Sequence, residues 1–324
     1  MGAMQAIRIH GFGGPEALEL EDVPVPTPGP GEALVRMAMA GVNYRDVYER
    51  VGRYGGTPPL TAGAEGAGTV EAVGAGASGV APGDRVAFTN VPGAYAQYVV
   101  APADRLIPLP DGISFELGAA FPLQGMTAHY LVHEFYRVTP GTTVLVHAAA
   151  GGMGLLLVQM LAQMHARVIG TTSTQAKAEA VRAAGAQDVI LYTQQNFASV
   201  VKELTGGKGA DLVLDGVGKT TFPGSLEAVR TRGTVVLYGS ASGPADPFPP
   251  NSLQSRSLTV AGGTLPNFIA TREELLRRAN DVLAMIRAGT LAFKIDRVLP
   301  LADAAQAHRL LESRATSGKL LLAV

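Results

Sequence analysis

The chain has 324 residues, of which 47% are apolar and 16% charged, with a net charge of −1 at pH 7. This length suits two domains of ordinary size. The balanced charge disfavours nucleic acid or an anionic membrane surface as the main partner. The absence of cysteine excludes disulfides, a cysteine nucleophile and cysteine-ligated metal sites. No apolar run suggests a bilayer span and no secretory signal is evident, so we expect a cytoplasmic protein with no membrane partner.

Residues 4–124 are rich in short predicted strands separated by Gly/Pro turns. This pattern predicts a small antiparallel barrel or sandwich. The strands are expected at 5–9, 18–23, 32–40, 69–73, 85–88 and 96–100. Two helices are expected to follow, over 114–120 and 127–135, the second of which bridges to the next domain.

From Thr142 the pattern changes to alternating strands and helices, which predicts right-handed crossovers and a doubly wound parallel sheet. The strands are expected at 142–147, 166–171, 188–191, 210–215, 233–238 and 258–261, and the helices at 152–164, 174–184, 196–205 and 219–229. The tail, with helices at 271–288 and 302–312 and strands at 295–299 and 319–323, is expected to return to the first domain. The predicted fold is therefore α/β, with a nucleotide domain over 125–265 inserted into a mainly β domain of residues 1–124 plus 266–324.

A loop of very small residues, 148–154, lies between the first strand and the first helix of the predicted sheet. Its spacing Ala149-x-Gly151-x-x-Gly154 resembles the dinucleotide-binding glycine pattern, with alanine in place of the first glycine. Small residues let a pyrophosphate reach the backbone N–H groups at a helix N-terminus. The alternative is an ordinary tight turn between a strand and a helix.

The second strand of the predicted nucleotide domain ends without an acidic residue. An NAD-selective unit places a carboxylate there to bind the ribose hydroxyls. Here hydroxyl groups follow over 171–174, and then Lys177, which suits a 2′-phosphate. The sequence therefore favours NADPH over NADH, although a capped, solvated helix start with an ordinary surface lysine has the same appearance.

Several separate segments give the chain a family resemblance over essentially its whole length. They are 41–48, 63–70, 80–86, 123–130, 147–154, 215–218 and 311–316. In these segments the chain resembles the zinc-free quinone oxidoreductases, the zeta-crystallin-like group of the medium-chain dehydrogenase/reductase superfamily. The resemblance implies a Rossmann domain inserted into a GroES-like catalytic domain, and a homodimer.

The zinc-dependent alcohol dehydrogenases of the same superfamily differ at two positions. That branch has a cysteine near the position of Asn43 and a histidine just before the glutamate that matches Glu65. This chain has Ala64 at the second position and no cysteine. A pair of histidines at helical spacing, His129 and His133, is interpreted as two helix residues near a domain junction, although a metal is possible in principle. We therefore expect no functional metal.

The resemblance also implies the residues of the site. Asn43, Tyr48 and Tyr54 are expected at the reacting centre, where Asn43 and Tyr48 offer hydrogen bonds to a substrate carbonyl and Tyr54 stacks on or covers a quinone ring. The expected cofactor contacts are Asn43, Asp46, Gln124, Thr127, Tyr130, Gly151, Gly152, Met153, Ser173, Lys177, Tyr192, Val217, Gly239, Ser240, Asn267, Phe268 and Arg314. Loose loop placement is the alternative for Tyr54, and a solvated helix end is the alternative for Arg314.

Three functions fit these observations. The first is an NADPH-dependent quinone reductase, because a quinone is electrophilic enough to accept hydride without metal assistance. The second is an NADPH-dependent alkenal or enoyl reductase. The third is a non-enzymatic protein, structural or RNA-binding like some zeta-crystallin relatives. The intact glycine loop and the segments at 43–48 and 124–130 favour an enzyme, and the balanced charge disfavours RNA.

Overall fold

A computed structural model of the chain describes residues 2–313 and 316–324, which form two compact units. Unit 1 comprises residues 1–123, 269–280 and 293–324, and unit 2 comprises residues 124–268 and 281–292. Each unit has its own sheet and its own apolar core. Within the described residues, no helix combines the length and apolarity that a membrane crossing requires.

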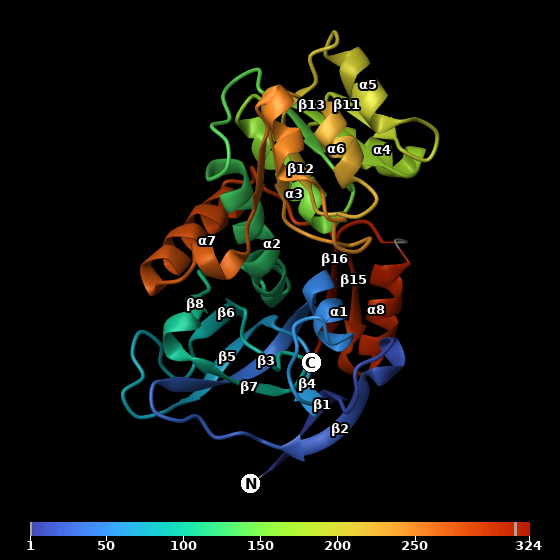
Figure 1. The fold of residues 1–324 in the computed structure, drawn as a ribbon. Helices are drawn as coiled ribbons and strands as arrows, with labels where there is room; N and C mark the ends of the chain where they lie inside the picture. The colour runs from blue at the N-terminus through green and yellow to red at the C-terminus, as the bar shows by residue number, and fades with distance from the viewer. Residues whose placement is uncertain (1, 314–315) are drawn as a thin grey trace. The chain divides into compact units, whose positions relative to one another are not determined.

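Unit 2 is built on a six-stranded sheet in which all neighbouring strands are parallel (Figure 1). Its strands are β9 (Thr143–Val146), β10 (Arg167–Thr172), β11 (Asp188–Leu191), β12 (Ala210–Asp215), β13 (Val229–Leu237) and β14 (Thr259–Gly262). They lie in the order β11-β10-β9-β12-β13-β14, so the direction of winding reverses between β9 and β12. The predicted doubly wound sheet is confirmed.

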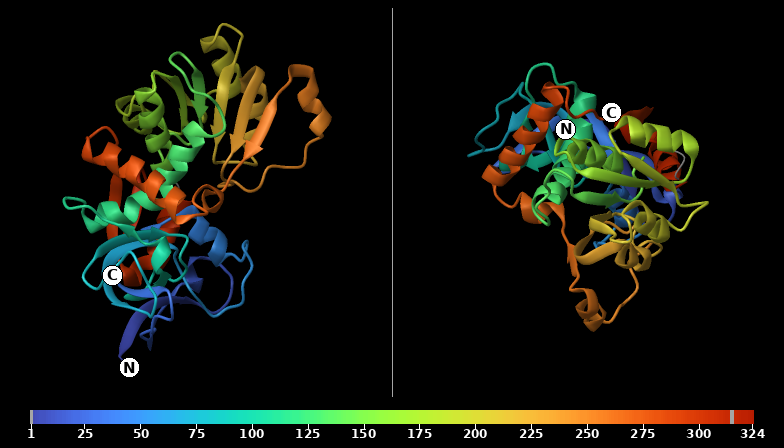
Figure 2. Two further views of the ribbon diagram at one scale, coloured as in Figure 1. Left: turned by 90° about the vertical axis from the view of Figure 1, so that its left-hand side faces the viewer. Right: turned by 90° about the horizontal axis from the view of Figure 1, so that it is seen from above.

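The crossovers of unit 2 contain the helices α3 (Gly152–Gln163), α4 (Gln175–Ala183), α5 (Phe197–Leu204) and α6 (Phe222–Ala228). The most buried of these is α3, because nearly every residue from Gly154 to Leu161 is apolar and faces the sheet or its neighbours. A 3-10 helix, η3 (Pro250–Arg256), precedes β14, which lies at the outer edge of the sheet (Figure 2).

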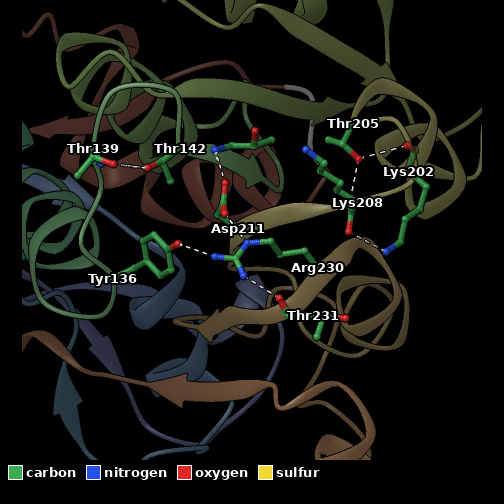
Figure 3. Close-up of polar contacts among 11 residues, drawn as sticks. Tyr136, Thr139, Thr142, Lys202, Thr205, Lys208, Asp211, Arg230 and Thr231 are labelled. Carbon is green, nitrogen blue, oxygen red and sulfur yellow. Dashed lines mark hydrogen bonds and ion pairs between the residues drawn. The ribbon is translucent and has the colours of Figure 1, made fainter.

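A network of polar contacts closes the amino end of this sheet (Figure 3). The carboxylate of Asp211, at the start of β12, accepts the backbone N–H of Thr143 at 2.8 Å and pairs with the guanidinium of Arg230. Arg230 also donates to the hydroxyl of Tyr136 at 3.1 Å. Asp211 and Arg230 therefore link β9, β12 and β13 at this end of the sheet.

Unit 1 contains two sheets. The three-stranded sheet has the order β2-β1-β4, with β1 (Ala3–Ile9), β2 (Glu19–Pro24) and β4 (Leu60–Thr61). The seven-stranded sheet runs β15-β16-β3-β5-β6-β8, and β7 also pairs with β3. Its strands are β3 (Glu32–Val42), β5 (Glu65–Val73), β6 (Arg85–Thr89), β7 (Tyr98–Pro102), β8 (Ile107–Pro108), β15 (Ile295–Pro300) and β16 (Lys319–Ala323).

Three short 3-10 helices lie in the described part of unit 1: η1 (Pro15–Ala17), η2 (Ala103–Arg105) and η5 (Leu301–Asp303). A further one, η4 (Leu265–Phe268), lies in unit 2.

The last strand of the chain completes the sheet of unit 1. Strand β16 pairs antiparallel with β3, so that Leu320 lies opposite Val42. Leu320 and Leu322 are buried in the same apolar cluster as residues of β1, β3, β5 and β6. Helix α8 (Ala304–Glu312) packs against β16. Lys319, the first residue of β16, thereby lies beside the end of β3, which Asn43 follows.

Two helices differ from the sequence prediction. Helix α1 (Tyr44–Arg50) was not predicted; a capping box between Asn43 and Asp46 starts it. The predicted helices at 114–120 and 127–135 are wrong as separate elements, because α2 runs unbroken over Phe115–His133 with Pro122 inside it. Proline normally breaks a helix, but here the next N–H, that of Leu123, donates to a Glu65 side-chain oxygen at 2.6 Å. The remaining long helix is α7 (Arg272–Arg287).

A substitution at Gly68 tests the packing of unit 1. A Cβ atom at Gly68 would lie 2.1 Å from the carbonyl oxygen of Arg36 on the neighbouring strand. Overpacking against rigid backbone costs about 1–3 kcal/mol, so Gly68→Ala should lower the Tm by roughly 2–10 °C, measured by thermal denaturation. Gly11→Ala is the control, since nothing lies within 4 Å of its Cβ position. Equal Tm values for both variants would contradict this packing.

Candidate active site

The glycine loop lies at the carboxyl end of β9 and opens α3. Gly151 is the N-cap of α3, and Gly152 and Met153 form its first turn. A Cβ atom at Gly154 would lie 2.4 Å from the carbonyl oxygen of Ala148, so only glycine lets the helix approach the loop this closely. The first backbone N–H groups of α3 are the kind that bind a pyrophosphate.

A buried amide lies beside this loop. The Oε1 atom of Gln124 lies 2.5 Å from the position of a Cβ atom at Gly152, and it is buried without a hydrogen-bond partner. An unpaired buried acceptor is costly unless a ligand supplies a donor. Gln124 and Thr127 both lie on α2, one turn apart. The structure thus brings Gln124 to the glycine loop, as a cofactor contact requires.

The residues predicted for a 2′-phosphate come together at the carboxyl ends of β10 and β11. Thr172 and Leu191 are register partners in these strands, so the residues that follow them, Ser173 and Tyr192, are neighbours. The side chain of Tyr192 is 41% exposed. Lys177 lies in the first turn of α4, where its backbone N–H donates to the capping hydroxyl of Thr174. Ser173, Tyr192 and Lys177 therefore lie near the N-terminus of α4.

The loops after β12 and β13 lie at the same end of the sheet. The carboxylate of Asp215 accepts the backbone N–H of Val217 at 2.9 Å. The hydroxyl of Ser242 donates to the carbonyl oxygen of Val217 at 2.8 Å, which ties the two loops together. Gly239 packs against the backbone of Gly216, where a Cβ atom would lie 2.7 Å from the Gly216 oxygen. Ser240 follows in the same turn and accepts the N–H of Gly243 through its carbonyl oxygen.

Tyr130 and Phe268 form an aromatic stack within unit 2. Their ring centroids are 4.2 Å apart with an interplanar angle of 9°. The Tyr130 hydroxyl donates to the carbonyl oxygen of Gly263 at 3.1 Å, and the residue is 1% exposed. Tyr130 therefore holds the η4 segment, which carries Asn267 and Phe268, onto α2. Arg314 lies outside the described residues.

A buried polar network that the sequence analysis missed supports the glycine loop. His147 contacts the hydroxyl of Thr171 through Nδ1 at 3.1 Å and that of Ser225 through Nε2 at 3.0 Å. Ser225 donates to Asp215 at 2.8 Å, so Nε2 of His147 carries the proton that Ser225 accepts. Burial lowers the pKa of His147, which keeps the ring neutral. Full burial gives this serine, histidine and aspartate a structural role.

Of the predicted catalytic residues, Asn43 lies in a buried polar cluster around Glu65. The Oε2 atom of Glu65 accepts the Asn43 side-chain N–H at 2.7 Å and the Lys319 ammonium at 2.6 Å, and Oε1 accepts the N–H of Leu123. Lys319 also donates to Oδ1 of Asn43 at 2.6 Å. All three side chains are buried. Lys319 was missed because a lysine at the start of an apolar strand is normally exposed.

Asn43 retains one weakly used N–H group. Besides the contact with Glu65, Nδ2 of Asn43 makes only a long contact, at 3.3 Å, with the carbonyl oxygen of Gly41. Gly41 itself has no room for a side chain, because its Cβ position lies 2.4 Å from both the Ala119 oxygen and a Glu65 oxygen. The predicted hydrogen bond from Asn43 to a substrate would use this N–H.

A second network extends from α1 to α8. Oδ2 of Asp46 accepts the N–H of Asn43 at 2.8 Å and the Tyr95 hydroxyl at 3.0 Å. The Tyr95 oxygen lies 3.3 Å from Nε2 of His308. Arg50 donates to Nδ1 of His308 at 3.1 Å, so the ring proton is on Nε2 and points to Tyr95. Arg50 also donates to both side-chain oxygens of Glu312 at 2.9 Å.

Burial governs the ionisation of this network. Desolvation raises the pKa of Asp46 to about 7, although Arg45 and the Asn43 N–H act in the opposite direction. Oδ1 of Asp46 is buried and has no hydrogen-bond partner. Burial, aided by Arg50, lowers the pKa of His308 to about 3. The chain of contacts therefore carries a neutral histidine beside an aspartate that titrates near neutrality.

Tyr48 and Tyr54 lie together at the carboxyl end of α1 and just beyond it. Their ring centroids are 6.0 Å apart in an edge-to-face arrangement. The guanidinium of Arg53 lies 4.3 Å from the centroid of the Tyr48 ring. Tyr54 is 58% exposed, which leaves much of its ring accessible to a planar ligand.

Three comparisons with known proteins identify the class of this molecule. Residues 29–111 match the alcohol dehydrogenase GroES-like domain, and residues 152–281 match the family described as zinc-binding dehydrogenase. The chain is 40% identical to the 2-haloacrylate reductase of a Burkholderia species and 41% identical to the quinone oxidoreductase of Pseudomonas aeruginosa, with 98% of each chain covered in both cases. It superposes on Escherichia coli quinone oxidoreductase complexed with NADPH with a TM-score of 0.96 at 37% identity, covering 99% of this chain and 100% of that one.

The parallel sheet with its glycine loop and the strand-rich unit 1 define an oxidoreductase of the medium-chain dehydrogenase/reductase superfamily. The resemblance seen in the sequence is thereby confirmed. The chain belongs to the quinone oxidoreductases of this superfamily.

The residues present do not fit a zinc site. The oxygen atoms of Asn43 and Glu65 already bind the Lys319 ammonium, which would repel a second cation. Position 64 is alanine, and the chain has no cysteine. Of the described residues, only His10, Glu19 and Glu21 cluster with metal-ligand spacing, at the surface of unit 1. His129 instead lies 3.4 Å from the carboxylate of Asp281.

The raised pKa of Asp46 predicts a stability change with pH. A carboxyl group whose pKa rises from 3.8 unfolded to about 7 folded contributes stability below about pH 4, and this contribution is lost as the pH rises through about 7. Asp46→Asn cannot ionise, so its stability relative to wild type should increase from pH 4 to pH 8 by at most about 4 kcal/mol. Denaturant unfolding at both pH values measures this. Asp104→Asn, an exposed aspartate of unit 1, is the control. A difference that did not depend on pH would contradict the assigned ionisation.

Proposed function

We propose that this protein is an NADPH-dependent quinone reductase that works without a metal. The observation that supports this most directly is the carboxyl end of the parallel sheet. There the glycine loop, the unpartnered Gln124 oxygen and the group Ser173, Lys177 and Tyr192 lie at the ends of β9, β10 and β11. The same end of the sheet has no acidic residue after β10 to repel a 2′-phosphate.

The residues present fit NADPH at this end of unit 2. The first turn of α3 would bind the pyrophosphate, and Ser173, Lys177 and Tyr192 would bind the 2′-phosphate. When bound, the cofactor supplies the hydride, so the protein contributes binding and orientation. The remaining proposed contacts are Asn43, Asp46, Gln124, Thr127, Tyr130, Val217, Gly239, Ser240, Asn267, Phe268 and, outside the described residues, Arg314.

Unit 1 is proposed to bind the acceptor. Tyr48 and Tyr54 present two rings edge to face, one of them largely exposed, which suits a flat quinone. The weakly used N–H of Asn43 and the hydroxyl of Tyr48 are proposed to donate to the acceptor's carbonyl oxygen. Residues 1–124 plus 266–324 would thus form the catalytic domain, and 125–265 the cofactor domain. A quinone is electrophilic enough to need only such hydrogen bonds.

The second candidate is reduction of an activated carbon–carbon double bond. The relative named 2-haloacrylate reductase is as similar to this chain as the quinone oxidoreductases are. Hydride from the same cofactor serves both reactions. An acceptor with a carboxylate, unlike a quinone, would also need a cation in the substrate-binding part of unit 1.

An optical assay of NADPH oxidation separates these functions. We expect rapid oxidation with 1,4-benzoquinone and slower oxidation with an α,β-unsaturated aldehyde or 2-chloroacrylate. Prior treatment with a chelator should leave the rate unchanged, because the site has no metal ligands to empty. Faster turnover of the alkene substrates would favour the second candidate. Loss of quinone reduction on chelation, reversed by zinc, would contradict the metal-free proposal.

Lys177→Ala tests the cofactor assignment. A charge-assisted hydrogen bond to phosphate contributes about 1.5–3 kcal/mol, so the variant should bind NADPH roughly ten- to a hundredfold more weakly. Binding of NADH should hardly change. Turnover at saturating NADPH should also be preserved, because this contact is equal in the ground and transition states. Titration of cofactor binding and steady-state kinetics measure these quantities.

Lys208→Ala is the matched control for this variant. Lys208 is exposed, in the same unit, just before β12 at the amino end of the sheet. It should bind both cofactors as wild type does. If Lys177→Ala weakened NADH and NADPH equally, the phosphate site would be misassigned, and a wild type that preferred NADH would overturn the choice of cofactor.

We also propose a cytoplasmic homodimer. Strand β14 lies at the edge of the parallel sheet and its residues are partly or fully exposed. An unpaired edge strand is commonly covered by the same strand of a symmetry mate. Light scattering at micromolar concentration should give twice the chain mass of 33.5 kDa. A monomeric mass would refute the dimer.

A further inference from the structure

The ammonium of Lys319 is one of the most deeply buried charges in unit 1. Lys319 is 2% exposed and begins β16, the last strand of the chain. Its Nζ atom lies 2.6 Å from a carboxylate oxygen of Glu65 and 2.6 Å from the amide oxygen of Asn43. Burying a charge is costly unless it is paired and hydrogen-bonded. Glu65 supplies the opposite charge, but the contact with Asn43 is a separate feature that charge balance does not require.

The contact with Lys319 gives the Asn43 amide a single orientation. A lysine ammonium only donates hydrogen bonds, so the amide atom that faces it must be the oxygen. The amide nitrogen then faces Glu65, to which it donates at 2.7 Å. Glu65 alone would leave the amide oxygen buried without a donor. The two charged neighbours together therefore define which way each polar atom of Asn43 points.

The orientation of Asn43 extends to α1. Asn43 is the N-cap of this helix, and its backbone N–H donates to Asp46 in the capping box. One turn later the helix carries Tyr48. A shift of Asn43 would move both the donor N–H of its amide and the start of the helix. Lys319 therefore contacts Asn43, 276 positions earlier in the sequence, where the proposed acceptor site begins.

We propose that Lys319 is a positioning residue for the reaction, which acts by orienting the amide of Asn43. This inference rests on the proposed reductase function, since Asn43 is assigned there to the acceptor. It separates two effects of one ammonium group. Pairing with Glu65 stabilises the fold, whereas the bond to Asn43 sets the rate.

Two variants distinguish these effects. Lys319→Met keeps most of the side-chain volume but leaves the Glu65 charge without its cation, so both the Tm and kcat/KM should fall. In Lys319→Met/Glu65→Gln no unpaired charge remains, so the Tm should recover towards wild type. Yet kcat/KM should stay about ten- to a hundredfold below wild type, the effect expected for losing a charged hydrogen bond. The glutamine amide either donates or accepts, so it cannot impose one orientation on Asn43.

Lys294→Met is the control, because Lys294 is an exposed lysine of the same unit whose ammonium donates to the hydroxyl of Ser317 at 3.1 Å. It should keep the wild-type kcat/KM. If Lys319→Met does not fold, the charge-neutral double variant carries the test. Recovery of both Tm and kcat/KM in the double variant would overturn the proposal, because Lys319 would then only stabilise the fold.

A crystal structure of the double variant gives a readout that does not depend on the proposed reaction. The Asn43 amide should lose its orientation towards position 65 or occupy two orientations. An unchanged Asn43 would overturn the proposal even if the activity fell. A wild type inactive with every acceptor would instead refute the proposed function, and the position of Asn43 would still decide whether Lys319 orients it.

Discussion

The architecture of unit 1 depends on the hydrogen bonds and the ion pair that the buried carboxylate of Glu65 makes. One oxygen accepts the Leu123 N–H, and the other accepts the Lys319 ammonium and the Asn43 amide. A single buried side chain thus joins β5 to α2, to the last strand and to the end of β3. Removing one member of a buried ion pair typically costs about 3–5 kcal/mol, so these four segments are held as one structure. The proline inside α2 is tolerated for the same reason.

In unit 2 the corresponding constraint is the exposure of backbone N–H groups at the start of α3. Small residues bring α3 close to β9 and leave its first N–H groups uncovered. The buried side chains of His147, Ser225 and Asp215 support the glycine loop. They hydrogen-bond to one another and to the loop after β12. Among the described residues of unit 2, Gln124 is the one left with a buried side-chain oxygen that has no hydrogen-bond partner. The polar side chains beneath the sheet's carboxyl end are therefore hydrogen-bonded, whereas the Gln124 oxygen without a partner lies beside Gly152 of the glycine loop.

The parallel sheet and the place of the glycine loop between β9 and α3 could be predicted from the sequence, because these depend on local periodicity and on residues close together in the chain. The assignment of Ser173, Lys177 and Tyr192 to a 2′-phosphate stays a prediction. Prediction from the sequence failed for one short helix and where partners are distant. Helix α1 was missed although its capping box is local, because the helix has only seven residues. The continuity of α2 through Pro122 depends on a carboxylate from β5, which is distant in sequence. Lys319 and His147 were ordinary residues in the sequence, since nothing local marks a lysine or histidine whose partners lie dozens to hundreds of positions away.

The pairing of the final strand with the end of β3 has a consequence for the order of biosynthesis. Asn43 and Glu65 leave the ribosome early, while the lysine that neutralises Glu65 follows 254 residues after it. Until then the nascent first domain lacks both the ammonium that pairs with Glu65 and strand β16 of its sheet. Most of unit 2, residues 124–268, is synthesised in the interval as one contiguous segment. The sheet of unit 1 is therefore completed only when β15 and β16, the last strands of the chain, have been made.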